Sequence, residues 1–164
     1  MPEVELQLRQ EDAKLVFLAV AYHLGRPGSE LDPITKQPVE HGLAEIASEL
    51  QPQLRLAATR IFLRDNQLRR LLSGMLGSIT ELKAYPMLEL RTDEDGGGRR
   101  SSVAGFDRSL RHLFPEVEED PANALDLAER MLMLKRRMDQ KMAELPAAEP
   151  EAKDKRRGWW PFRR

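Results

Sequence analysis

The stretch PQLRLAATRIFLRDNQLRRLLSGMLGSITELKAY, residues 52–85, carries the strongest periodic pattern in the chain. Apolar side chains recur along it at alternating spacings of four and three residues, with one polar interruption at Asp65. Such spacings place side chains on one face of a helix. The pattern therefore predicts one long helix, about 50 Å in length, that ends before Pro86. Its apolar seam is Leu54, Ala58, Ile61, Leu68, Leu72, Met75, Ile79 and Leu82.

Small residues lie inside this predicted helix. In SGMLGS, residues 73–78, Ser73 and Gly77 are four residues apart, and so are Gly74 and Ser78. One interpretation is that a neighbouring helix approaches closely at this point. The other is a kink, because each glycine costs a helix interior about 1 kcal/mol. The sequence leaves both interpretations open.

The composition extends the helical interpretation to the rest of the chain. Charged residues make up 32% of it and aromatic residues only 5%, so the core must be narrow relative to the surface. Leu, Ala, Glu, Arg and Gln are abundant and favour helices. We predict an all-α or mostly α fold, an elongated bundle of about four to five helices around one long central helix. Residues 4–8 alternate apolar and polar side chains, which predicts a minor strand pairing with residues 87–90.

The other predicted elements flank the long helix on both sides. Residues 11–24 have apolar side chains at helical spacing, and Gly25 and Pro27 stop that helix. Residues 25–42 contain several prolines and glycines and predict a long loop before a helix resumes near Glu40. The last helix is expected to begin at an Asp120 cap and to carry an apolar stripe that consists of Leu127, Met131, Leu134, Met138, Met142 and Leu145.

The charge is divided unevenly along the chain. Residues 153–164 contain six Lys or Arg and one acidic residue, a net charge of +5, which leaves −6 for residues 1–152. We predict a helical domain over residues 1–145, a Pro/Ala/Glu-rich linker over 146–155, and a disordered basic tail with Trp and Phe over 156–164. An acidic body and a basic tail predict different partners for the two parts.

No motif in the sequence indicates an enzyme. The absence of cysteine excludes disulfides, thiolate metal sites and a cysteine nucleophile. The glycines at 96–98 do not have the spacing of a phosphate-binding loop. We therefore lean towards a non-enzymatic protein with no cofactor and no metal. The alternative is an enzyme or metal protein that uses His41 with carboxylates of the 25–42 loop, or with Glu45 and Glu49 at helical spacing.

The sequence also predicts a location. Its first residues do not resemble a signal peptide, and the longest apolar run, residues 15–22, is far shorter than the roughly 20 residues that span a bilayer. We expect a cytoplasmic protein, with the inner face of the membrane as a peripheral attachment site.

Both tryptophans of the chain lie in KRRGWWPFRR, residues 155–164. Gly158 and Pro161 oppose a regular helix, so these rings are not expected in the protein's own core, and exposed aromatic rings imply a partner. Trp and Arg together suit an anionic membrane surface or a groove on another protein. The predicted membrane- or partner-binding residues are Lys155, Arg156, Arg157, Trp159, Trp160, Phe162, Arg163 and Arg164.

The segment RRGWWPFRR, residues 156–164, resembles the Trp/Pro/Arg-rich antimicrobial peptides of the cathelicidin class, in which arginines flank a tryptophan-proline core. The resemblance covers these nine residues and is one of composition. It implies insertion into a membrane interface and some capacity to bind nucleic acid. A whole acidic domain precedes the segment here, which favours tethering over killing.

The leading hypothesis is a helical adaptor or scaffold, whose acidic body binds a partner protein and whose tail docks to a membrane. The heptad-like helices also suit a homodimer. A nucleic-acid-associated subunit is the alternative, and its contact residues are Arg55, Arg60, Arg64, Arg69 and Arg70, unless acidic helices neutralise them. A third hypothesis makes the tail a docking peptide for another protein. RRSSV, residues 99–103, fits a site for a basophilic kinase.

Overall fold

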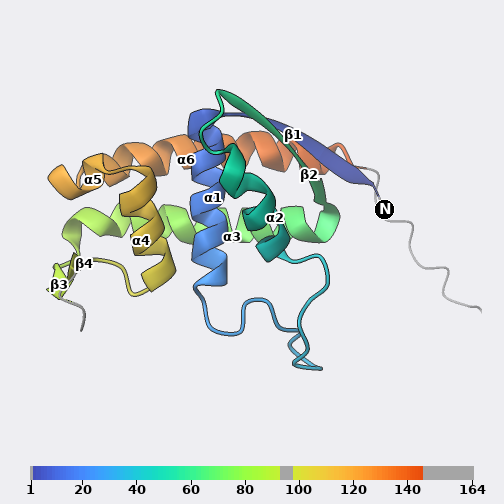
Figure 1. The fold of residues 1–164 in the computed structure, drawn as a ribbon, viewed down its shortest axis with the longest axis horizontal. Helices are drawn as coiled ribbons and strands as arrows, with labels where there is room; N and C mark the ends of the chain where they lie inside the picture. Colours follow the sequence, from blue (N-terminus) through green and yellow to red (C-terminus); the bar gives the residue numbers. More distant parts are fainter. Residues whose placement is uncertain (1, 93–97, 146–164) are drawn as a thin grey trace, which may run out of the picture.

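The computed structural model describes residues 2–92 and 98–145, and Figure 1 shows their arrangement. Most of the described residues lie in helices, as the composition predicts. The elements in chain order are β1 (Glu3–Arg9), α1 (Gln10–Leu24), α2 (Leu43–Leu50), the 3-10 helix η1 (Gln51–Gln53), β2 (Ala58–Arg64), α3 (Asp65–Ala84), the 3-10 helix η2 (Tyr85–Met87), β3 (Arg91–Thr92), β4 (Gly98–Arg99), α4 (Ala104–Leu113), α5 (Glu116–Glu119) and α6 (Asn123–Ala143).

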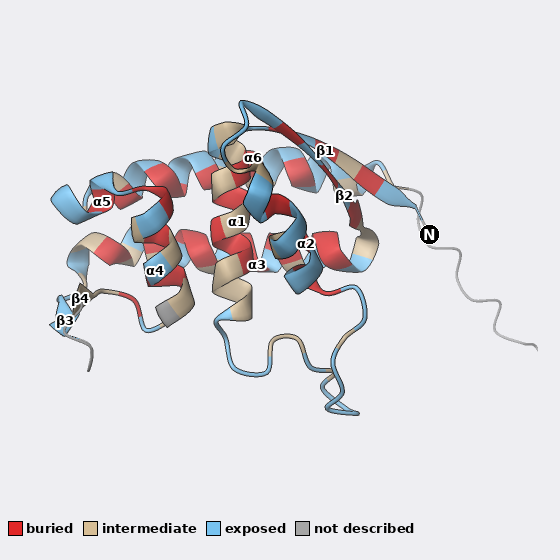
Figure 2. Ribbon diagram, in the orientation of Figure 1, coloured by how far each residue is buried: buried red, intermediate tan, exposed pale blue. Residues whose placement is uncertain are grey.

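The core lies between α1, α3 and α6. The two longest helices, α3 and α6, run side by side in opposite directions, and α1 crosses them (Figure 1). Buried residues lie along all three of these helices, and α2 and α4 pack on either side of α1 (Figure 2). No helix among the described residues is both long enough and apolar enough to cross a bilayer.

A two-stranded antiparallel sheet lies against the helices. β1 pairs with β2 in a register that runs from Glu3 opposite Arg64 to Arg9 opposite Ala58. The strands bury alternate side chains, as the pleat requires: the buried set is Val4, Leu6, Leu8, Thr59, Ile61 and Leu63. A second, very short pair joins β3 to β4.

The prediction of one helix over residues 52–85 is wrong for its first third. Residues 58–64 form β2, and the helix begins only at Asp65. The apolar positions Ala58 and Ile61 fit a helical seam, but Thr59, Ile61 and Leu63 also alternate with exposed residues as a strand requires. Pairing with β1 decides between the two patterns. The predicted strand partner at residues 87–90 is also wrong, because β1 pairs with β2.

Other predictions agree with the structure. The helix predicted over residues 11–24 is α1, and α2 resumes after the long loop. The last helix begins at Asn123, later than predicted, because Asp120 forms a turn in which its Oδ1 accepts the Ala122 N–H at 3.0 Å. Most of the stripe of α6 is buried as expected: Leu127, Met131, Leu134 and Met138.

The glycines of α3 mark a close approach between helices. A Cβ atom on Gly74 would lie 2.8 Å from the carbonyl oxygen of Ala19, and one on Gly77 would collide with the Tyr22 ring. Helix α3 continues through both glycines. Of the two interpretations of residues 73–78, the structure therefore confirms the close approach, and α1 is the neighbouring helix.

Candidate functional site

The arginines predicted for nucleic-acid binding are spread over different elements. Arg55 is exposed in the turn before β2, Arg60 and Arg64 share the outer face of β2, and Arg69 and Arg70 belong to α3. They do not form one helical row, since residues 54–64 are not helical.

Carboxylates accompany three of these arginines. Arg60 Nε lies 2.8 Å from Glu5 Oε1, and Arg64 Nε lies 3.8 Å from Glu3 Oε1. Helix α3 adds a third ion pair, with 2.9 Å between Arg69 Nε and Asp65 Oδ2. Acidic neighbours thus balance the positive charge of three of the five arginines, which weakens the attraction of this region for a phosphate backbone.

The predicted tail residues lie outside the described residues. This holds for the whole set from Lys155 to Arg164 and for the linker that precedes it. The candidate site that follows is therefore formed by residues of the body.

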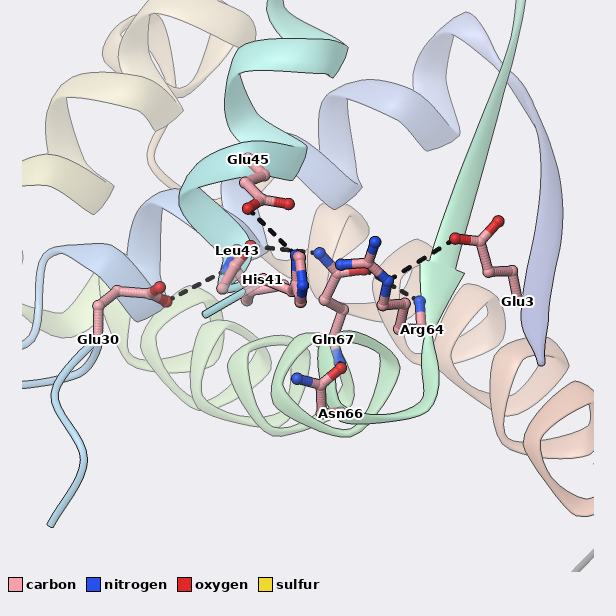
Figure 3. A network of polar contacts seen from close by, with 9 residues as sticks. Glu3, Glu30, His41, Leu43, Glu45, Arg64, Asn66 and Gln67 are labelled. Carbon is pink, nitrogen blue, oxygen red and sulfur yellow. Dashed lines mark hydrogen bonds and ion pairs between the residues drawn. The ribbon is translucent and has the colours of Figure 1, made fainter. Parts of the chain in front are cut away.

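A cavity on the body lies where β1, β2 and α3 meet the end of the long loop. Its volume is about 670 Å³, and it is lined by Glu3, His41, Arg64, Asp65 and Asn66. We call it the α3-start groove. Figure 3 shows Glu3, His41, Arg64 and Asn66, which come from three separate segments of the chain: β1, the end of the long loop, and the junction of β2 with α3.

Gln67, which follows the groove residue Asn66, connects the start of α3 to the long loop. Gln67 is 3% exposed, and its Oε1 accepts the backbone N–H of Arg64 at 3.0 Å. Its Nε2 donates to the carbonyl oxygen of Gly42 at 3.4 Å, while its own N–H donates to Asn66 Oδ1 at 2.9 Å. One side chain thus caps the first turn of α3 and ties that turn to the loop.

His41 forms the opposite rim of the α3-start groove. Its φ of 55° places the backbone in the left-handed region. Its Nδ1 lies 3.5 Å from Glu45 Oε1 in an exposed pair. His41 itself lies outside α2, which begins at Leu43, and Glu49 is not among the lining residues. Among the described residues, no three His, Asp or Glu side chains are arranged to hold a metal ion.

A second polar contact closes the base of the long loop. Glu30 Oε1 accepts a hydrogen bond from His23 Nε2 at 2.9 Å and another from the Leu43 N–H at 3.3 Å. Burial lowers the pKa of His23, although the Glu30 carboxylate opposes this shift, and Arg70 and Arg26 reinforce it. The sequence does not predict this clamp, because nothing in the spacing of His23 and Glu30 indicates a bond across a loop.

A third polar cluster lies at the far end of α3. Asp107 is 1% exposed, its Oδ2 lies 3.0 Å from Arg111 Nη2, and its Oδ1 accepts the Arg100 N–H at 3.2 Å. Burial first, and the Asp107 charge second, raise the pKa of Tyr85 to about 12, so the phenol stays protonated at neutral pH. Asp107 was not singled out in the sequence, because a lone Asp in an amphipathic helix ordinarily faces solvent.

The α3-start groove offers both donors and acceptors. Arg64, Asn66 and His41 supply N–H groups, and Glu3 and Asp65 supply carboxylate oxygens. A mixed lining of this kind suits a polar peptide segment better than a uniformly charged polymer. The sequence matches no protein-family profile, no curated protein and no solved structure.

Proposed function

We propose that this chain is a non-enzymatic helical adaptor or scaffold. Its body binds a partner protein, and its basic aromatic tail attaches the body to an anionic membrane surface, the inner face of the cytoplasmic membrane. One observation carries the proposal: both tryptophans lie in a segment of net charge +5 that follows an acidic body.

The packing of the body supports this division. Helices α1, α3 and α6 bury one another's apolar faces, so the described domain has a core made from its own side chains. The last turn of α6 lies beside β1, where Lys141 Nζ donates to the carbonyl oxygen of Glu5 at 3.3 Å. The described end of α6 therefore lies beside β1, the strand whose Glu3 lines the α3-start groove.

The expected strength of attachment follows from the charge. Each Lys or Arg near an anionic surface contributes about 1 kcal/mol, so a net charge of +5 gives on the order of 5 kcal/mol before aromatic burial is added and ordering is subtracted. Attachment of this strength is reversible and is weakened by salt. The tail thus suits recruitment to a surface.

For the partner protein we favour the α3-start groove over the predicted homodimer seam. The seam positions of α3 are buried within the chain against α6 and α1: Leu68, Leu72, Met75, Ile79 and Leu82. A second copy that used this seam would have to displace α6. The groove is open and requires no such rearrangement.

Co-sedimentation with vesicles tests the membrane half of the proposal. The full chain is mixed with phosphatidylcholine vesicles that contain or lack phosphatidylserine, beside a variant without residues 153–164 and a variant that carries Trp159→Ser and Trp160→Ser. We expect the full chain to pellet with anionic vesicles, the truncated chain to remain in the supernatant, and the serine variant to bind more weakly. Equal pelleting of all three proteins would show that the tail does not attach the chain to membranes.

The same preparation distinguishes the alternatives. Binding to single-stranded oligonucleotide that weakens steeply with salt, and is lost in an Arg60→Gln and Arg64→Gln variant, would favour the nucleic-acid hypothesis. Indifference to both vesicles and oligonucleotide would leave the docking-peptide hypothesis for the tail.

A further inference from the structure

We propose that Ser102 is a phosphorylation site for a basophilic serine/threonine kinase. Arg99 and Arg100 precede it by three and two residues, and the apolar Val103 follows it. Kinases of this class recognise arginines at those positions by pairing them with carboxylates. The inference goes beyond the proposed membrane adaptor and does not depend on it.

The structure distinguishes Ser102 from its neighbour Ser101. Ser101 is 2% exposed, its Oγ donates to Glu81 Oε2 at 3.0 Å, and the same Oγ accepts the Val103 N–H at 3.1 Å. This hydroxyl is therefore buried and already takes part in two hydrogen bonds. Ser102 is exposed, so only the second serine presents a hydroxyl to an enzyme.

The local backbone suits recognition by a kinase. Residues 100–103 join β4 to α4 and belong to neither a helix nor a strand, as Figure 1 shows for the link between these two elements. A kinase binds its substrate as an extended segment. Ser102 itself lies outside every helix and strand, although its neighbours are anchored on both sides: the Arg100 N–H donates to Asp107 Oδ1 at 3.2 Å, and the Val103 carbonyl oxygen accepts the Asp107 N–H at 3.1 Å.

The surroundings of Ser102 favour the phosphorylated product. Ser102 lines a cavity of about 380 Å³ together with Arg91, Arg99 and Arg100, which face two carboxylates, those of Glu81 and Glu89. Arg100 is held in place because its Nη1 donates to the Leu88 carbonyl oxygen and its guanidinium lies 6.0 Å from the Tyr85 ring centroid. The three arginines exceed the two carboxylates by one charge, so a phosphate on Ser102, with a charge of about −1.5 to −2, would pair with this excess and leave the cavity slightly negative.

The position in the chain adds a second favourable term. Val103 is the N-cap of α4, so Ser102 directly precedes the positive end of that helix dipole. Negative charge at this end stabilises a helix. The cavity and the helix therefore act in the same direction on a phosphate at Ser102.

The chemistry requires ATP and an external kinase. The Ser102 Oγ attacks the γ-phosphorus of ATP, the bond from that phosphorus to the bridging oxygen breaks, ADP leaves, and the hydroxyl proton passes to the general base of the kinase. The product carries a charge of about −1.5 to −2 at neutral pH.

The test uses the full chain with Mg-ATP and the catalytic subunit of cAMP-dependent protein kinase. Fragment mass spectrometry locates the phosphate, and a reference peptide confirms that the kinase is active. We expect one phosphate, on Ser102, and a loss of at least tenfold in the initial rate for Ser102→Ala. Ser48→Ala, which removes an exposed serine on α2, is the matched control and should keep the full rate.

A second variant tests the recognition itself. Arg99→Gln keeps the serine, and we expect its initial rate to fall at least tenfold, while its far-UV circular dichroism matches that of the unmodified chain. Phosphate on Ser101 or at another position, an unmodified chain beside a phosphorylated reference peptide, or an unchanged rate in Arg99→Gln would each overturn the proposal.

Discussion

At the scale of single residues, the Asp107 carboxylate is the most consequential charge inside the body. It is almost fully buried and faces Arg111, which is 28% exposed and also lies 3.7 Å from Glu118. Removing one partner of a buried pair leaves the other uncompensated, at a cost of several kcal/mol. The partial exposure of Arg111 reduces that cost.

We expect Asp107→Asn to lower the free energy of unfolding by about 3 kcal/mol, measured by urea denaturation. Asp139→Asn is the control, because it removes the acid of the exposed Lys135–Asp139 pair on α6 and should cost less than about 1 kcal/mol. Equal effects of the two substitutions would contradict the assignment of Asp107 to a buried pair.

The clamp between His23 and Glu30 predicts a pH dependence. Since burial lowers the pKa of His23 below its usual 6.5, the unfolded chain takes up a proton at a higher pH than the folded chain does. The resulting stability is present above pH 6.5 and is lost as the pH falls through the lower folded-state pKa. The free energy of unfolding should therefore fall between pH 7 and 5.

The control for this prediction is His23→Gln, whose amide retains a donor for Glu30 but does not titrate. Its urea midpoint should change less between pH 7 and 5 than that of the unmodified chain. The same pH dependence in both proteins would show that another group is responsible.

At the scale of elements, the contact between α1 and α3 depends on glycine. Alanine ordinarily stabilises a helix interior by about 1 kcal/mol relative to glycine. At Gly74 the added methyl would meet the Ala19 carbonyl oxygen, which belongs to the backbone of α1 and cannot turn aside. We expect Gly74→Ala to destabilise the protein by about 1–3 kcal/mol.

Ser73→Ala is the matched control for Gly74→Ala, because Ser73 is the neighbouring residue on the exposed face of α3. It should be neutral or slightly stabilising by thermal denaturation, as helix propensity alone predicts. A neutral Gly74→Ala would mean that the two helices separate without cost.

Helices were predicted from sequence patterns more successfully than strands. The seam from Leu68 to Leu82 is buried as predicted, since a helix sets its own period over many residues. Residues 58–64 were misassigned because their partner β1 lies far away in the sequence, and short apolar runs fit either period. Arg60 and Arg64 still share a face, because a spacing of four returns to the same side of a strand and nearly to the same side of a helix.

The α3-start groove was only partly predictable for the same reason. The sequence grouped His41 with Glu45, four residues further along the chain, only as part of an alternative metal or enzyme site, and it named Arg64 only as a candidate contact for nucleic acid. It did not indicate that Glu3 would join them, because β1 brings that residue from the start of the chain through the strand register. The clamp by Gln67 likewise depends on a contact with the distant Gly42.

At the scale of the whole molecule, the charge is divided between an acidic body of net charge −6 and a basic segment of net charge +5. In the proposed function the acidic body supplies a packed domain with a mixed polar groove, and the basic aromatic segment would supply affinity for a surface of opposite charge. The two parts are joined by ten residues, 146–155, which span at most about 35 Å when extended. Recruitment through the tail would thus hold the groove close to the membrane.

Tryptophan fluorescence of the full chain tests this account most directly, because Trp159 and Trp160 are its only tryptophans. Vesicles containing phosphatidylserine should shift the emission to shorter wavelength, and salt should weaken the shift without abolishing it, since the rings enter the interface while the arginines pair with headgroups. Neutral vesicles should produce a smaller shift. An emission spectrum that stays unchanged at saturating anionic lipid would contradict the account.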